Sequence, residues 1–274
     1  MSTETPTSLL VVPEPSAPRL TRAVTGHDQT GAAIDLRVVE ERPLTIYLNS
    51  REIVTSMTIG DHPEWLALGF LVNQGMVRPT DAVTGIDYDA ELETVVVRTA
   101  TETDHEAKLA RATRTSGCAV GTVFGDMMEG LEGLTLPDTR LRVSDLYGLS
   151  QAINRTPSLY LEAGAIHGTC LCQGADPLAY FEDVGRHNAV DKLAGWMRSG
   201  GVDPADKTLY TTGRLTSEMV IKCALMGIPS LVSRSGFTAW GVDIARQVGL
   251  TVIGRLKGTR FVCLSGEDRL EWDV

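Results

Sequence analysis

The stretch that organises the second half of the chain reads LAYFEDVGRHNAVDKL and runs from Leu178 to Leu193. It opens with a short apolar run that is typical of a buried strand and closes with apolar residues at helical spacing. Between the two runs, Gly185 permits a turn and Asn188 is a candidate helix cap. The segment therefore predicts a strand, a charged turn and a helix in direct succession.

Half of the residues from 182 to 193 are ionisable. Charges at this density are costly to bury unless each one has a partner. Two interpretations stay open for this turn. It is a surface turn held together by ion pairs, or Arg186 and His187 meet an anionic ligand at the positive end of the following helix.

Strands and helices alternate beyond this segment, which predicts a largely parallel sheet covered by helices. Ligands collect at loops that follow the strand ends in such sheets. The expected strands are 178–181, 208–212, 230–233, 251–254 and 260–264, the expected helices are 189–198, 217–226 and 238–248, and the loops are 182–188, 213–217, 233–238 and 255–260.

The first half of the chain has a different pattern. Residues 32–138 predict a smaller, strand-rich domain, and Pro137-Asp138 marks its boundary with a larger domain over 139–274. Residues 1–31 are rich in Ser, Thr and Pro and are expected to be a disordered tail. The fold class is therefore α/β within the larger domain and α+β overall. The expected strands of the smaller domain are 34–39, 44–48, 53–58 and 94–98, and the expected helices of this half and the boundary region are 63–74, 123–131 and 144–154.

The composition describes a soluble globular protein, with 43% hydrophobic and 22% charged residues and no apolar run of membrane-spanning length. A net charge of −10 argues against a general nucleic-acid binder. Five cysteines, an odd number, and no secretory signal favour reduced thiols and a cytoplasmic location. A local basic pocket is still expected in the C-terminal part, from Arg234, Arg246, Arg255, Lys257 and Arg260.

Cys118 is the best candidate for a nucleophile. It lies in TSGCAVGT (residues 115–122), where glycines and small side chains predict a mobile, accessible loop. Arg111, Arg114 and the helix expected at residue 123 would favour its thiolate. The alternative is a small apolar residue in a tight turn, and the local sequence does not decide between the two.

The remaining cysteines predict structural roles. Cys170 and Cys172 are spaced too closely for a common zinc knuckle, so no metal site is expected there. Cys223 and Cys263 fall on a helix face and a strand and are expected in the core. His167 lies between glycines, which let a ligand approach, and the loops 233–236 and 257–260 could each hold a phosphate group.

Several of these segments together resemble the FdhD/NarQ family over about residues 32–265. The resemblance implies a larger domain with the three-layer, cytidine-deaminase-like architecture, although the zinc signature of deaminases is absent. The segments that carry the resemblance are ERPLTIYLN at 41–49, LALGFL at 66–71, the loop of Cys118, IHG at 166–168, residues 182–193, GRLTSEMV at 213–220 with Lys222, and 254–261.

The resemblance also implies a function. A protein of this family would be a sulfurtransferase that takes persulfide sulfur from an IscS-type cysteine desulfurase onto Cys118. It would pass that sulfur to Mo-bis(molybdopterin guanine dinucleotide), here bis-MGD, before the cofactor enters formate dehydrogenase. A homodimer is implied as well, and a guanine nucleotide would be a partial mimic of the cofactor. The implied cofactor-binding residues are Arg255, Leu256, Lys257, Gly258, Thr259 and Arg260, followed by His167, Asp183, Arg186, His187 and Ser235.

One departure from the family pattern bears on the mechanism. Many members carry Cys-x-x-Cys in the mobile loop, whereas the second position here is Gly121. A single thiol suffices for persulfide transfer, but the missing thiol keeps a second function open, that of a chaperone that binds bis-MGD without covalent chemistry. A nucleotide-acting hydrolase is a third possibility from the alternating pattern alone, and it would require a metal or a base beside water.

Overall fold

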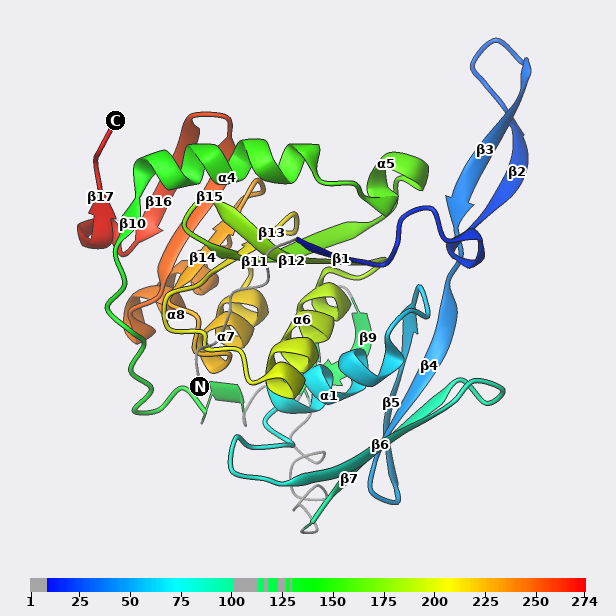
Figure 1. The fold of residues 1–274 in the computed structure, drawn as a ribbon, viewed down its shortest axis with the longest axis horizontal. Helices are drawn as coiled ribbons and strands as arrows, with labels where there is room; N and C mark the ends of the chain where they lie inside the picture. The colour runs from blue at the N-terminus through cyan, green and yellow to red at the C-terminus, as the bar shows by residue number, and fades with distance from the viewer. Residues whose placement is uncertain (1–8, 101–112, 116–117, 123–126, 129) are drawn as a thin grey trace.

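A computed structural model describes residues 9–100, 113–115, 118–122, 127–128 and 130–274. It contains one large and one smaller sheet, each covered by helices (Figure 1). The large sheet has seven strands in the order β1 (Leu10–Val12), β12 (Asp176–Asp183), β11 (His167–Gln173), β13 (Thr208–Thr211), β14 (Ser230–Ser233), β15 (Thr251–Lys257) and β16 (Arg260–Ser265).

The large sheet is mixed, so the prediction of a largely parallel sheet is wrong. The strands β13, β14 and β15 run parallel, but β11 is antiparallel to both of its neighbours and β16 is antiparallel to β15. The physical reason is the length of the connections. Only Gly174 and Ala175 join β11 to β12, and only Gly258 and Thr259 join β15 to β16, and such short turns can join only antiparallel strands.

Helices cover both faces of the large sheet, which gives the three layers that were expected (Figure 1). Leu146, Leu149 and Ile153 of α4 pack on one face, against residues such as Tyr180 and Ile253. The other face is covered by three helices that begin directly after strands. These are α6 (Arg186–Gly200), α7 (Ser217–Leu225) and α8 (Ala239–Val248), while α4 spans Val143–Arg155 and the short α5 spans Leu159–Ala163.

The smaller sheet has four strands, in the order β5 (Arg51–Thr58), β4 (Arg42–Leu48), β7 (Thr94–Thr99) and β6 (Val83–Asp89). The helix α1 (Pro63–Asn73) covers it, and its core includes Leu44, Ile46, Leu66, Leu71 and Val95. The sequence predicted each of these elements except β6, because the residues 83–89 alternate weakly between apolar and polar side chains.

Two glycines allow α1 to lie directly against α6. A Cβ atom at Gly69 would lie 1.7 Å from the carbonyl oxygen of Asp191, and one at Gly195 would lie 1.9 Å from that of Trp65. Neither position therefore has room for any side chain unless the helices separate. This backbone contact joins the smaller sheet to the helical layer of the large one.

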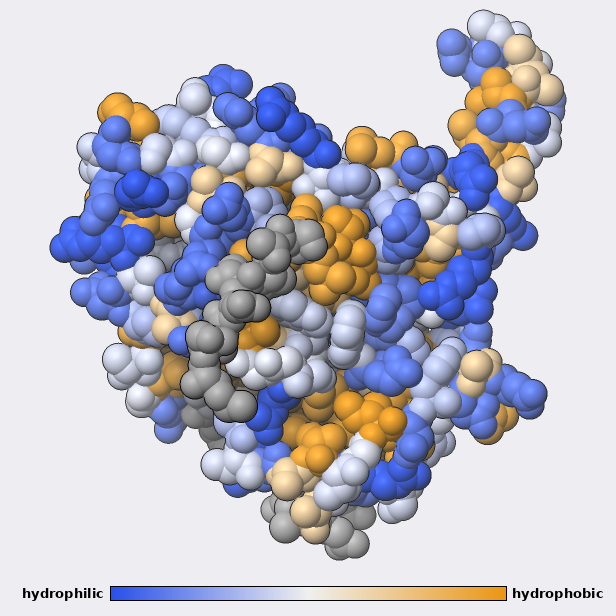
Figure 2. Space-filling model, viewed as in Figure 1, coloured by the Kyte–Doolittle hydropathy of each residue, from blue (hydrophilic) through white to orange (hydrophobic). Residues whose placement is uncertain are grey.

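The N-terminal region is more ordered than the sequence predicted. Leu10–Val12 pair in parallel with β12, Val12 is buried, and Leu20 of the turn η1 (Pro18–Leu20) is buried as well. A hairpin of β2 (Thr21–His27) and β3 (Ala33–Val39) then projects from the body (Figures 1 and 2). The expectation of a disordered tail is wrong for residues 10–27. The strand β1 has only three residues and takes its stability from the sheet that it joins, so its own sequence carries little pattern.

The Cys118 segment also differs from its prediction. Cys118 begins β9 (Cys118–Thr122), which pairs with β8 (Thr113–Thr115) in a hairpin instead of a loop. Most of the helix expected at 123–131 lies outside the described residues. The short strands β10 (Leu141–Arg142) and β17 (Leu270–Glu271), with the turn η2 (Glu267–Arg269), complete the chain. Among the described helices, none combines the length and the apolar character that crossing a membrane requires.

Candidate functional site

The loops that follow the strands of the large sheet meet at one edge. Strand register places Asp183 beside His167, and Thr211 beside Ser233. The N-terminal end of β11 therefore lies among the C-terminal ends of β12, β13 and β14, as the direction of each strand requires. We call the residues His167, Arg186, Thr212, Arg214 and Arg234 at this edge the sheet-edge site.

His167 is held by a hydroxyl group and surrounded by cations. Its Nδ1 lies 3.3 Å from Oγ1 of Thr212, which also accepts a hydrogen bond of 3.0 Å from the backbone N–H of Gly168. Burial lowers the pKa of His167, and the positive charges of Arg186, Arg234 and Arg214 lower it further. His167 is thus neutral at neutral pH in a strongly positive environment, which suits an anionic ligand.

Each arginine of the sheet-edge site comes from a different element. Arg186 begins α6 and crosses Gly213, where an added Cβ atom would lie 2.7 Å from its Cδ. The guanidinium carbon of Arg234 lies 5.4 Å from the ring centre of Tyr160 on α5. Arg234 and Tyr160 line a small pocket of about 80 Å³ together with Asn154, Thr156 and Thr212. The sequence did not single out Thr212 or Tyr160, since neither has a local signal.

His187 follows Arg186 but is largely buried. Burial, together with the charges of Lys222 and Arg186, lowers its pKa to about 2. Its neutral ring places Nε2 3.4 Å from a carboxylate oxygen of Glu218, so the ring proton belongs on Nε2. The other nitrogen, Nδ1, is then an acceptor with no hydrogen-bond partner in the described part of the chain. His187 is therefore neutral at neutral pH, and its Nδ1 can accept a hydrogen bond from a ligand.

Ser235 ties the sheet-edge site to the hairpin at residues 255–260. Its backbone N–H donates to Oγ of Ser233 over 2.9 Å, and its carbonyl oxygen accepts from the N–H of Arg255 over 2.7 Å. The hydroxyl of Ser233 donates in turn to the carbonyl oxygen of Gly213 over 2.7 Å. Hydrogen bonds thus fix the loops after β13 and β14 and the start of the hairpin relative to one another.

The hairpin between β15 and β16 presents a second basic surface. Arg255, Lys257 and Arg260 are exposed and line a cleft of about 640 Å³. Leu256 points the opposite way and is 2% exposed in the core under α4, so its side chain is unavailable to a ligand, contrary to its assignment from the family resemblance. Arg246 donates to the carbonyl oxygen of Leu264 and does not line this cleft. The single basic pocket expected from the sequence is therefore two surfaces.

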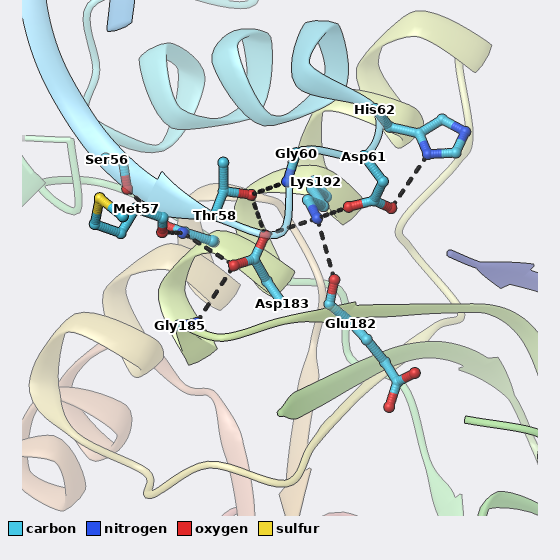
Figure 3. Close-up of polar contacts among 11 residues, drawn as sticks. Ser56, Met57, Thr58, Gly60, Asp61, His62, Glu182, Asp183, Gly185 and Lys192 are labelled. Carbon is cyan, nitrogen blue, oxygen red and sulfur yellow. Dashed lines mark hydrogen bonds and ion pairs between the residues drawn. The ribbon is translucent and has the colours of Figure 1, made fainter. Parts of the chain in front are cut away.

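A buried ionic network lies beneath the N-terminal end of α6 (Figure 3). Lys192, which is fully buried, lies between Asp61 and Asp183, 2.7 Å from the carboxylate of Asp183. Thr58 donates to the same carboxylate over 2.6 Å. Burial opposes the charge of Lys192, but the carboxylates of Asp183 and Asp61 outweigh it and raise its pKa. Asp183 thus supports the site from below and, being fully buried, does not line it as the family resemblance had implied.

Asn188 links the smaller sheet to the first turn of α6. The helix begins at Arg186 after Gly185, so Asn188 is not its cap as predicted. Instead, its side-chain amide donates to the carbonyl oxygen of Met57 over 2.7 Å and to Asp183 over 3.2 Å, and it accepts from Ser56 over 3.2 Å. The charged turn therefore places Asp183 and Lys192 in buried ion pairs and Arg186 at the sheet-edge site, while the binding of an anion by Arg186 and His187 stays a prediction.

The described thiols are poor nucleophiles. Cys170, Cys172 and Cys223 are fully buried and Cys263 is partly buried. Burial raises the pKa of Cys172, Cys223 and Cys263, so their thiolates are disfavoured at neutral pH. The side chain of Cys118 lies outside the described part of the structure, but its strand β9 contacts β5, the strand that binds Asn188.

Glu182 gives the protein a predicted pH dependence of stability. Its buried carboxylate accepts from the N–H groups of Leu159 and Tyr160, and burial raises its pKa from 4.5 to about 7. Between these pH values the folded state holds more protons than the unfolded state, so the free energy of unfolding falls as the pH rises. We expect Glu182→Gln to gain about 1–3 kcal/mol relative to the wild type between pH 4.5 and pH 8, because it has no charge to bury.

Urea unfolding at a series of pH values measures this difference. Glu162→Gln is the matched control, because Glu162 is exposed on the same short helix α5 and its replacement should leave the slope with pH unchanged. If the free energy of unfolding changes with pH equally in Glu182→Gln and the wild type, Glu182 does not bind a proton in the folded state over this pH range.

The chain is similar to known proteins over most of its length. A model described as the FdhD/NarQ family matches residues 39–271. A protein of Chromobacterium violaceum named sulfur carrier protein FdhD is 33% identical over 252 residues, 88% of this chain and 93% of that protein. A protein of the same name from Geobacillus kaustophilus is 30% identical over 238 residues, 84% of this chain and 88% of the relative.

A solved structure is similar over nearly the whole chain. It is the crystal structure described as that of a formate dehydrogenase accessory protein from Desulfotalea psychrophila. The two share 28% sequence identity with a TM-score of 0.74, and the likeness covers 92% of this chain and 98% of the other. The mixed α/β architecture described above is therefore shared with that protein.

Proposed function

This chain belongs to the FdhD/NarQ family, and from this premise we propose that it is a sulfur carrier in the maturation of a formate dehydrogenase. The names of relatives that match over most of their length support this role. A cysteine desulfurase as sulfur donor, a homodimeric assembly and a cytoplasmic location belong to the same proposal.

The sulfur would travel on Cys118. The Cys118 thiolate attacks the outer sulfur of a persulfide on the desulfurase, the donor's S–S bond breaks, and the donor cysteine leaves as a thiolate. Cys118 then carries the persulfide, with no change in the total number of electrons. Its outer sulfur passes to the molybdenum of bis-MGD, which supplies two electrons from its reduced state, and Cys118 returns to a thiolate.

The assignment of Cys118 as the carrier thiol rests on the burial and raised pKa of the other cysteine thiols. Four of the five cysteines have described side chains, and three of these are fully buried while Cys263 is partly buried with a raised pKa. A carrier must meet both a donor protein and a cargo, so its thiol must be reachable. Cys118 is the one that sequence and burial leave for this task.

The sheet-edge site suits the cargo chemically. Arg186, Arg214 and Arg234 offer charge to its phosphate groups, and neutral His167 with Thr212 offers hydrogen bonds to polar atoms. The strand of Cys118 contacts β5, and β5 binds Asn188 in the first turn of α6. The strand β5 thus links the strand of Cys118 to the first turn of α6, where Arg186 lies, which supports transfer between them.

A direct test is to incubate the protein with a cysteine desulfurase and cysteine, and then to map all five cysteines by mass spectrometry. We expect one additional sulfur atom on the peptide of Cys118, removable by a reductant. Binding of a guanine nucleotide with no sulfur on any cysteine would favour the alternative, a chaperone that binds bis-MGD without covalent chemistry, which Gly121 keeps open. Sulfur on Cys263 would overturn the assignment of the carrier thiol.

A further inference from the structure

Two pairs of polar side chains join the helices α6 and α7, which lie side by side (Figure 1). His187 and Glu218 are the second residues of these helices, and Nε2 of His187 lies 3.4 Å from a carboxylate oxygen of Glu218. Asp191 and Lys222 follow about one helical turn later, and Nζ of Lys222 lies 2.8 Å and 2.7 Å from the two carboxylate oxygens of Asp191. Residues four apart lie on the same face of a helix, so the two pairs are consecutive contacts along one interface.

The inner pair, Asp191 and Lys222, fixes how the two helices lie against each other. Asp191 is 1% exposed and Lys222 is 3% exposed. Asp191 also accepts a hydrogen bond of 2.7 Å from the side-chain amide of Asn73, the last residue of α1. These buried contacts hold α6 and α7 together independently of Glu218, so we expect the protein to fold when Glu218 is replaced.

The inner pair also affects the charge of His187. A carboxylate beside a histidine ordinarily favours the charged ring. At His187 this effect is outweighed, because burial lowers the pKa of the ring and the charges of Lys222 and Arg186 lower it further. His187 is therefore neutral although Glu218 lies beside it. A neutral ring carries a single proton, and its neighbours decide which of the two nitrogens holds it.

Glu218 is the neighbour that selects the nitrogen. A carboxylate accepts hydrogen bonds and has no proton to donate, so the ring nitrogen beside it has to be the donor. The proton of His187 thus lies on Nε2, and Nδ1 is an acceptor with no partner among the residues that the structure describes. If the proton were on Nδ1, the same ring would be a donor toward its ligand. His187 follows Arg186 of the sheet-edge site, so this choice decides which chemical group fits beside Arg186.

We propose that Glu218 is a positioning residue, which keeps the proton of His187 on Nε2 so that Nδ1 accepts a hydrogen bond from an N–H or O–H group of the ligand at the sheet-edge site. The arginines of that site attract acceptor groups such as phosphate oxygens, whereas a bare Nδ1 repels them and requires a donor. His187 thereby distinguishes a ligand that carries both an anionic group and a donor from a simple anion. This inference rests on the proposed function, because it assigns a residue to the recognition of the cargo.

Nuclear magnetic resonance measures the position of the ring proton directly. Long-range proton–nitrogen correlation spectra of the isotope-labelled full-length protein distinguish a protonated ring nitrogen from a bare one, and His187→Gln identifies the signals of His187 among the five histidines. We expect the proton on Nε2 in the wild type. In Glu218→Leu the ratio of the Nε2–H form to the Nδ1–H form should fall roughly 10-fold, because a hydrogen bond to a charged acceptor is lost. Glu218→Gln should stay close to the wild-type ratio, because its amide oxygen can accept the same bond.

Glu64→Leu is the matched control. Glu64 is likewise the second residue of a helix, α1, so its replacement removes a negative charge from the N-terminus of a different helix. It should leave the ratio of the two ring forms of His187 unchanged. Glu218→Ala, which adds no apolar bulk at the helix contact, should show the same change as Glu218→Leu and serves in its place if the leucine variant does not fold.

The proposal is overturned if the wild type carries the proton on Nδ1 or on both nitrogens, or if neither Glu218→Leu nor Glu218→Ala changes the ratio. In cells that depend on a variant with a changed ratio, the maturation of formate dehydrogenase should fall roughly 10-fold, and full maturation would also overturn the proposal. Sulfur loading of Cys118 separates this inference from the proposed function, since the spectra do not depend on it. A changed ratio with normal loading and reduced maturation supports both, and a changed ratio in a protein that never accepts sulfur supports the role of Glu218 while the sulfur-carrier role fails.

Discussion

Replacing Cys118 with alanine is expected to abolish the maturation of formate dehydrogenase without unfolding the protein. The alanine leaves no nucleophile to receive the sulfur, since the described thiols are buried or have a raised pKa. The change falls at the first residue of β9, in a two-stranded hairpin outside the large sheets, so the main cores are untouched. The measurement is formate dehydrogenase activity in cells whose own family member has been deleted and replaced by the variant.

Cys263→Ala provides the comparison, because it removes a partly buried thiol from β16 and should preserve maturation. Circular dichroism and the unfolding midpoint of purified Cys118→Ala should equal those of the wild type. Full formate dehydrogenase activity with Cys118→Ala would rule out a carrier thiol at this position. That result would instead support the alternative function, a chaperone that binds bis-MGD without covalent chemistry.

Replacing Lys192 with methionine is expected to cost about 3–5 kcal/mol of unfolding free energy. Methionine fills a similar volume but leaves Asp61 and Asp183 buried without the cation that both contact. These two carboxylates come from the loop after β5 and from the end of β12, so their repulsion acts where the smaller sheet meets the large one. Urea unfolding measures the loss.

Lys207→Met is the corresponding change in a surface pair, because the partner Asp206 is half exposed, and it should cost only about 0–1 kcal/mol. The double variant Asp61→Asn/Lys192→Met should recover part of the loss, since one of the two unpaired charges is gone. If Lys192→Met unfolds at the same urea concentration as the wild type, the network has no structural role.

Local pattern in the sequence was sufficient for most of the individual elements. The helices α1, α4 and α7 and the strands β4, β5 and β14 lie where the spacing of apolar residues, the glycines and the prolines predicted them. These signals are local, because the spacing of apolar residues that is typical of a helix or strand can be recognised within that segment alone. The loops 182–188, 213–217 and 233–238 were also correctly grouped, since strand ends at one sheet edge follow from chain direction.

Such local patterns do not predict contacts between residues that are far apart in the sequence. Asp183 was read as lining a ligand site, but its charge is met by Lys192 on α6 and by Thr58 from the smaller sheet. Leu256 belongs to the core because α4 covers that face of the hairpin. The pairing of β1 with β12 depends on an open sheet edge about 170 residues away along the chain.

The amino-acid sequence by itself determined the order of most helices and strands of the two larger sheets, the resemblance to a family, and the candidate thiol at position 118. Each of these depends on residue types and short spacings. The tertiary structure alone decided which charges are buried in pairs, which cations share a surface, and that His187 and Glu218 meet across the first turns of two helices. The physical reason is that burial and charge pairing are set by neighbours in space, and chain topology brings those neighbours together from separate parts of the sequence.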